Sequence, residues 1–139
     1  MLESIVEATK NFCIHQLRCT PNELESIDYE TELYVGELEV ITKDNEKYIV
    51  YVCASKNFIQ NVAFAMLEEE QSDDETLYDM AMECTNLIVG SAKVIASKKN
   101  VDFDIATPKV NFETLKNKDL DIKIITCNDE VIAIGMKKV

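Results

Sequence analysis

A long amphipathic helix in the middle of the chain constrains the fold more than any other sequence feature. Ser72, followed three residues later by Glu75, has the form of a capping box and predicts a helix start inside an acidic stretch. From there the pattern predicts a helix to about Lys98, with basic residues at its C-terminal end. At about 100° per residue one wide arc holds Leu77, Met80, Ala81, Cys84, Leu87, Ile88, Ser91, Val94 and Ile95. Such an arc requires a core to cover it.

Two further helices and a hairpin are expected before this helix. Apolar residues at helical spacing predict amphipathic helices over residues 2–17 and 56–70. Two runs rich in β-branched and aromatic residues, 33–42 and 47–55, are separated by the polar KDNE. They predict an antiparallel β-hairpin.

Strands are expected again after the long helix, over residues 101–112, 121–128 and 131–139. A tight turn at Asn128-Asp129-Glu130 joins the last two. Pro108 should lie at a sheet edge or a bulge, because proline cannot donate to a strand ladder. Residues 113–120 are compatible with a loop or with a short helical turn.

The predicted order of elements is α-β-β-α-α-β-β-β. Tight hairpins imply antiparallel pairing, and three amphipathic helices need one sheet face to cover. We therefore expect an α+β, two-layer domain in which amphipathic helices cover an antiparallel or mixed sheet. A chain of 139 residues fits a single domain, 1–139.

Composition and charge exclude several classes of function. The chain has 26 acidic and 14 basic residues, for a formal charge of −12, which disfavours binding to a nucleic-acid backbone. No apolar run approaches the ~20 residues that cross a bilayer, and the N-terminus has early acids where a secretory signal has basic residues. Glycine-rich phosphate loops are absent. We expect a cytoplasmic protein that binds neither nucleic acid nor membrane.

The cysteines predict neither a metal site nor a disulfide framework. The five cysteines are scattered through apolar segments without a CxxC pair, and the chain has one histidine. Cys13 and His15 do not share a face of a short helix, so they are poor joint ligands. The expectation is small buried thiols and no bound metal.

A line of polar residues runs along the long helix opposite its apolar arc. Asp79, Glu83, Asn86 and Gly90 are spaced by four, three and four residues and fall within roughly 60° of each other. Met82 and Val89 are expected to flank this line, away from the core. A glycine inside a helix costs about 1 kcal/mol relative to alanine. Either a partner approaches closely here, or Gly90 packs against a neighbouring helix.

With its flanks this line forms the pattern D-x-x-x-E-x-x-N-x-x-x-G-x-A-K, read here as Asp79, Glu83, Asn86, Gly90, Ala92 and Lys93. It resembles the signature of the CheX/CheC/FliY family of chemotaxis phosphatases. The segments IATPKV and DEVIAIGMKKV resemble the strand after the signature helix and the final hairpin strand of CheX-like proteins. The resemblance covers most of the chain.

The resemblance implies a phosphatase that hydrolyses the aspartyl phosphate of a CheY-like response regulator. Asn86 would orient the attacking water, and Glu83 would pair with a lysine of the receiver. Surrounding contacts to the partner would come from Asp79, Met82, Val89, Gly90 and Lys93. No cofactor is expected on this chain, because Mg²⁺ would belong to the receiver.

The family resemblance also bears on the number of sites and on assembly. The first predicted helix lacks a second ExxN pair, because Lys10 follows Glu7 three residues later, so we expect one site per chain and a CheX-like protein. The resemblance to CheX-like proteins also implies a homodimer. Two other functions remain open. One is a non-catalytic dimeric module that binds a phosphorylated receiver or a flagellar switch component. The other is a dimerisation domain in which the Glu-Asn pair is coincidental.

Overall fold

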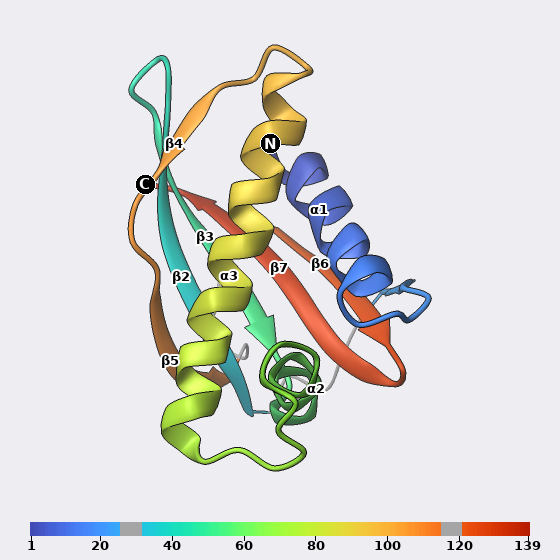
Figure 1. Cartoon of the computed structure of the whole chain (residues 1–139). Helices are drawn as coiled ribbons and strands as arrows, with labels where there is room; N and C mark the ends of the chain where they lie inside the picture. Colours follow the sequence, from blue (N-terminus) through green and yellow to red (C-terminus); the bar gives the residue numbers. More distant parts are fainter. Residues whose placement is uncertain (26–31, 115–120) are drawn as a thin grey trace.

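An antiparallel sheet forms one layer of the fold, and three helices lie across one of its faces (Figure 1). The structure is a computed structural model that describes residues 1–25, 32–114 and 121–139. The helices are α1 (Leu2–His15), α2 (Lys56–Leu67) and α3 (Asp74–Ser97). The strands are β1 (Asn22–Leu24), β2 (Glu32–Thr42), β3 (Lys47–Ala54), β4 (Phe103–Ile105), β5 (Lys109–Thr114), β6 (Asp121–Cys127) and β7 (Glu130–Lys138). The predicted α+β two-layer architecture is confirmed.

The sheet is built from the two predicted hairpins. Its strand order is β1-β6-β7-β3-β2-β4, and β5 also pairs with β2. Strands β2 and β3 pair from Tyr34 opposite Ala54 to Ile41 opposite Lys47. Asn128 and Asp129 connect β6 to β7 with φ values of 53° and 66°. Those left-handed conformations suit a two-residue hairpin turn, as the sequence predicts.

Two parts of the strand prediction are corrected. The single strand expected over residues 101–112 is divided into β4 and β5, which pair with different stretches of β2. Pro108 lies in the break between them, at the edge of the sheet, because it has no N–H for a ladder bond. The short strand β1, which pairs with β6, has too few residues for a periodic signal. Residues 113–114 belong to β5, while 115–120 lie outside the described residues.

The helix ends also differ from the prediction. Helix α1 stops at His15, and α2 stops at Leu67 because Glu68 adopts a left-handed conformation with φ 59°. Ser72 is not the cap of α3. Asp73 is the cap, and its carboxylate accepts a 2.8 Å hydrogen bond from the Thr76 amide.

Ser72 instead fixes the connection between α2 and α3. Its amide donates to the Gln60 side-chain oxygen at 2.9 Å, and its hydroxyl donates to the Glu69 carboxylate at 2.8 Å. The acidic connection is therefore anchored to α2 before α3 begins.

The main hydrophobic core lies between the helices and the sheet. Its largest fully buried side chains include Ile5 of α1, Phe58 of α2 and Ile88 of α3. A second, smaller cluster contains Leu33, Val35, Tyr51, Cys53, Ile124 and Ala133. No helix in residues 1–25, 32–114 and 121–139 combines the length and apolarity needed to cross a bilayer.

Candidate functional site on helix α3

The inner face of α3 is fastened to β2 at two points. Tyr78 packs edge-on against Tyr34 of β2, with ring centroids 5.1 Å apart. Farther along, Thr85 faces Gly36 so closely that a Cβ on Gly36 would lie 2.9 Å from the Thr85 Cβ and nearer still to its hydroxyl oxygen. Thr85 is fully buried, and its hydroxyl donates to the Ala81 carbonyl oxygen at 2.8 Å. These contacts set the rotation of α3 about its own axis.

This rotation differs from the one that the apolar pattern predicts. The buried residues of α3 are Leu77, Ala81, Cys84, Thr85, Ile88, Val89, Ala92 and Ala96. Leu87 and Val94, which the sequence places in the core, are 40% and 58% exposed, and Ser91 is exposed as well. The prediction assigned Thr85 no place in the core. An isolated glycine in a predicted strand signals close approach of another element, so Gly36 was the available clue.

The polar line on the outer face is where the sequence predicts it. Asp79, Glu83 and Asn86 are exposed, and Gly90 is partly exposed one turn later. We call these four residues the ridge. Within the described parts of the chain, the Glu83 and Asn86 side chains form no hydrogen bond or ion pair. Both can therefore reach a second molecule without first breaking an internal contact.

Gly90 has open space around it. A Cβ built on this residue would meet no heavy atom within 4 Å, apart from its own helix backbone and chain neighbours. Packing against a neighbouring helix, one of the two explanations that the sequence left open, is therefore not supported. The space beside Asn86 is available to something outside the described residues.

The predicted flanking residues divide into three cases. Val89 is fully buried, so its predicted position on the outer surface is wrong. Met82 is half-buried. Lys93 is half-buried, and its ammonium forms a 3.3 Å ion pair with Asp104 of β4. The apolar residue that lies on the outer side near Asn86 is Leu87.

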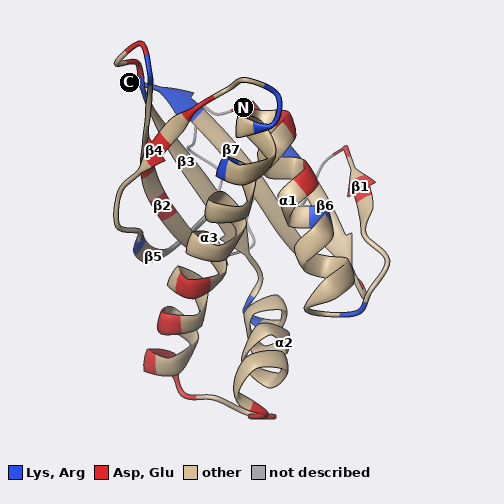
Figure 2. Ribbon diagram, turned by 45° about the horizontal axis from the view of Figure 1, so that its top comes forward, with Lys and Arg blue, Asp and Glu red and all other residues tan. Residues whose placement is uncertain are grey.

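The ridge has acidic surroundings. Figure 2 shows acidic residues at successive turns of the N-terminal half of α3 and in the connection from α2. Asp74 and Glu75 occupy the first turn, where negative charge is favoured by the helix dipole. Hydrogen bonds from Thr76 lower the pKa of the Asp73 carboxyl, which keeps this cap ionised. A partner that covers this half of α3 needs a basic surface.

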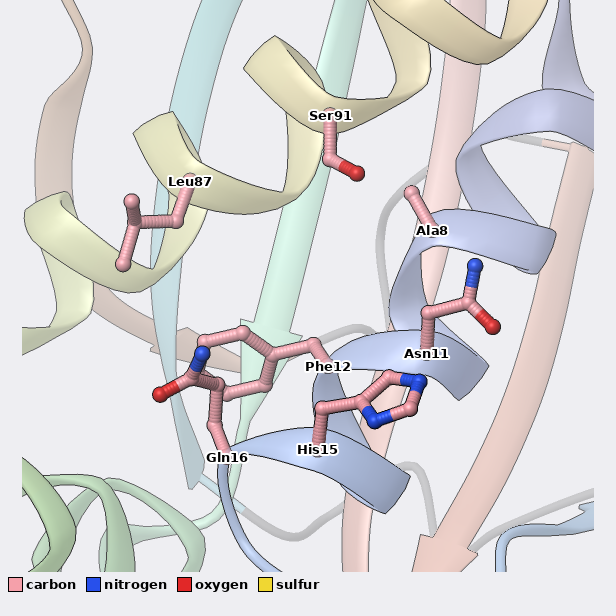
Figure 3. Close-up of a pocket in the computed structure, with 7 residues that line it drawn as sticks. All are labelled: Ala8, Asn11, Phe12, His15, Gln16, Leu87 and Ser91. Carbon is pink, nitrogen blue, oxygen red and sulfur yellow. The ribbon is translucent and has the colours of Figure 1, made fainter.

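A groove borders the ridge on the side of α1. It has a volume of about 250 Å³ and is lined by Ala8, Asn11, Phe12, His15, Gln16, Leu87 and Ser91. Figure 3 shows the Phe12 ring lying between α1 and α3, with Leu87 and Ser91 on the opposite wall. The apolar pattern of the sequence does not predict this groove, because it places Leu87 and Ser91 in the core.

The cysteines only partly follow the prediction. Cys13, Cys53 and Cys84 are buried thiols, as expected, and burial raises the pKa of the Cys84 thiol, which makes it unreactive at neutral pH. Cys19 and Cys127, in contrast, are joined in a disulfide across 108 residues of sequence, which corrects the expectation of thiols only. Together with Cys13 they form the one group among the described residues that could hold a metal ion.

Comparison with known proteins places the chain in a family. Residues 40–132, more than half of the chain, match the family model described as chemotaxis phosphatase CheX. This range includes all of α3 and the whole ridge. A search of curated proteins finds no match.

Solved structures share the fold over nearly the whole chain. The chemotaxis protein CheX from Vibrio vulnificus has a TM-score of 0.80 at 18% identity, covering 98% of this chain and 95% of that one. CheX from Desulfovibrio desulfuricans has a TM-score of 0.76 at 18% identity, with 99% and 97% covered. A CheX–CheY–BeF3–Mg²⁺ complex from Borrelia burgdorferi has a TM-score of 0.65 at 18% identity, with 99% and 96% covered.

Proposed function

The chain belongs to the CheX family of chemotaxis phosphatases, and on that premise we propose that it hydrolyses the aspartyl phosphate of a CheY-like response regulator. Asn86 and Glu83 enter the receiver's active site in this reaction. The observation that carries the proposal is the exposure of these two side chains, without an internal partner among the described residues, on a helix whose opposite face is fastened to the sheet.

Asn86 acts on the water. Hydrolysis forms a bond between the water oxygen and phosphorus and breaks the bond from phosphorus to the aspartyl oxygen, releasing orthophosphate. Phosphoryl transfer depends mainly on position and charge stabilisation. The Asn86 carbonyl oxygen accepts from the water, and its amide donates to a phosphoryl oxygen. A neutral side chain does both without repelling the anion.

Glu83 sets the register between the two proteins. It precedes Asn86 by three residues, so the two side chains project from neighbouring turns of one face. Its carboxylate pairs with a lysine in the receiver's site, a charge-assisted contact that defines where Asn86 enters. The metal ion of this reaction, Mg²⁺, is held by the receiver. The Borrelia complex contains CheX together with CheY, BeF3 and Mg²⁺, which supports a CheY-like partner for this chain.

The rest of the ridge shapes the contact. Gly90 leaves room for the partner's backbone, and Leu87 supplies the apolar contact that the sequence assigned to Val89. Asp79 extends the negative charge by one turn and steers a basic surface toward Glu83. Lys93 contributes through its pair with Asp104, which ties α3 to the sheet edge. We further propose a cytoplasmic homodimer, with one ridge per chain.

The test is release of orthophosphate from receivers of the same organism, phosphorylated with acetyl phosphate in Mg²⁺. The wild-type chain, at one tenth of the receiver concentration, should accelerate release. Asn86→Ala should lower the acceleration about 100-fold, the scale seen when one positioned transition-state group is removed. Asn61→Ala, the same change at an exposed position of α2, should leave it unchanged.

A charge reversal at Glu83 provides a second test of the proposed function. Glu83→Lys should abolish acceleration by repelling the receiver lysine, whereas Glu3→Lys makes the same change in net charge on α1 and should have little effect. The proposal is wrong if Asn86→Ala retains full acceleration. Binding of the phosphorylated receiver with an undiminished phosphoryl lifetime would favour the non-catalytic module instead.

A further inference from the structure

The C-terminal end of α1 lies beside the turn from β6 to β7 (Figure 1). Three cysteine sulfur atoms gather there. The Sγ atoms of Cys13, Cys19 and Cys127 lie within 4.8 Å of one another. All three residues are buried, with exposures of 0%, 8% and 2%. They come from three separate segments, namely α1, the chain that follows it and the end of β6.

The backbone is specifically shaped to bring Cys19 back over Cys13. Arg18 adopts a left-handed conformation with φ 53°, which is costly for a residue with a side chain. As a result the Cys19 amide donates to the Cys13 carbonyl oxygen at 3.1 Å, and the Cys19 sulfur lies 3.5 Å from the same oxygen. Two left-handed residues, Asn128 and Asp129, follow Cys127 on the other side.

Cys13 is a free thiol beside the disulfide that joins Cys19 to Cys127. Reduction of this disulfide leaves three thiols in one buried group. A soft metal ion can displace thiol protons on binding.

We propose that Cys13, Cys19 and Cys127, when reduced, form a three-thiolate binding site for Cu(I). Thiolates select soft ions such as Cu(I). With metal–sulfur bonds of about 2.3 Å, three sulfurs around one ion lie roughly 4 Å apart. The Cys13 sulfur already lies within 4.8 Å of the other two, and reduction frees Cys19 and Cys127 to separate from their bonding distance. Among the described residues no fourth His, Cys, Asp or Glu joins the group, and structural zinc sites use four donors.

A surface cavity borders one of the three cysteines. It has a volume of about 480 Å³, and its lining includes Cys127, His15 and Arg18. A metal site requires an entry path, and this cavity reaches the site at Cys127. The Arg18 guanidinium at this cavity carries charge opposite to that of an anionic copper–thiolate complex.

Metal binding requires prior reduction of the disulfide by a second molecule. A dithiol reductant transfers two electrons and two protons to the Cys19–Cys127 disulfide and becomes a disulfide itself. The three thiols then release three protons to the solvent as three copper–sulfur bonds form, and copper stays Cu(I) throughout. The disulfide and the bound metal ion are therefore alternative links between the region of α1 and the end of β6.

The experiment uses the whole chain, reduced with a phosphine under nitrogen and then freed of the reductant. Cu(I) is titrated in the presence of a chromogenic Cu(I) chelator as competitor. The wild type should hold one Cu(I) per chain, with absorption from thiolate-to-copper charge transfer. Cys13→Ala should weaken the affinity at least 100-fold. Cys53→Ala, the same change at a buried cysteine of the second core cluster, should leave it unaltered.

Far-ultraviolet circular dichroism and melting curves establish that each variant is folded. If Cys13→Ala does not fold, Cys13→Ser replaces it, because serine keeps the volume but offers a hard oxygen donor. The proposal is overturned if the reduced wild type holds Cu(I) no more tightly than the Cys13 variant does. It is equally overturned if Cys53→Ala loses as much affinity as Cys13→Ala.

Discussion

Gly36 and Gly90 differ in the space around them. Gly36, in β2, faces the inner side of α3, where any Cβ would collide with Thr85. Gly90, in α3, faces outward, where a Cβ would meet no heavy atom within 4 Å. The packing of the chain explains the first glycine and does not explain the second.

The difference separates the face of α3 that packs on the sheet from the face that we propose meets a partner. A glycine inside a helix costs about 0.5–1 kcal/mol relative to alanine, and at Gly90 no contact of the described chain offsets that cost. The glycine is adjacent to Asn86 on the ridge, one turn away. We therefore assign its benefit to a surface that approaches the ridge from outside.

The largest effect is expected from a charge on the inner face. Val89→Asp should lower the free energy of unfolding by about 3–5 kcal/mol, because it buries a carboxylate without a partner at a position with 0% exposure. Chemical denaturation measures this directly. Leu87→Asp, two residues away on the exposed side, should change it by less than about 1 kcal/mol. Equal losses in both variants would show that the rotation of α3 described above is incorrect.

A smaller loss is expected at the point where α3 meets β2. Gly36→Ala should lower the free energy of unfolding by about 2–3 kcal/mol, because the added methyl overlaps Thr85 and forces α3 away from the sheet. Thermal and denaturant unfolding provide the measurement. Thr85→Ala in the same chain removes the nearest atom and should recover part of the loss. Purely additive effects of the two substitutions would contradict a direct contact between these residues.

The smallest change in stability has the opposite sign. Gly90→Ala should raise the free energy of unfolding by about 0.5–1 kcal/mol, because alanine favours the helix and has free space at this position. Acceleration of receiver dephosphorylation should fall in the same variant. A variant that is more stable and fully active would remove the reason for assigning Gly90 to a partner.

The sequence was sufficient to predict the ridge because its residues are local to one helix. Asp79, Glu83 and Asn86 share a face by helical spacing alone, and all three are exposed as predicted. The two hairpins are likewise visible from β-branched runs and turn residues. The shared face of the ridge and the two hairpins depend on neighbours close in sequence, and both were predicted correctly.

Other incorrect predictions concern residues whose burial or pairing depends on segments distant in sequence. Whether Thr85 and Val89 face the core depends on Gly36, some 50 residues earlier, which permits the close approach of α3. The pairing of Cys19 with Cys127 spans 108 residues and has no spacing signal. The cap of α3 is a different case, because Ser72 and Asp73 are adjacent polar residues and either is compatible with capping. In the structure Ser72 contacts Gln60, and Asp73 accepts the hydrogen bond from the Thr76 amide.

The most direct test of the central claim is the saturation curve for orthophosphate release as the phosphorylated receiver is increased. Asn86→Ala should lower kcat about 100-fold and leave KM within about threefold, because the carboxamide acts on the water and contributes little to affinity. Gly90→Leu, which obstructs the space beside Asn86, should raise KM strongly. An Asn86→Ala chain with unchanged kcat would contradict the assignment of Asn86 as the catalytic residue.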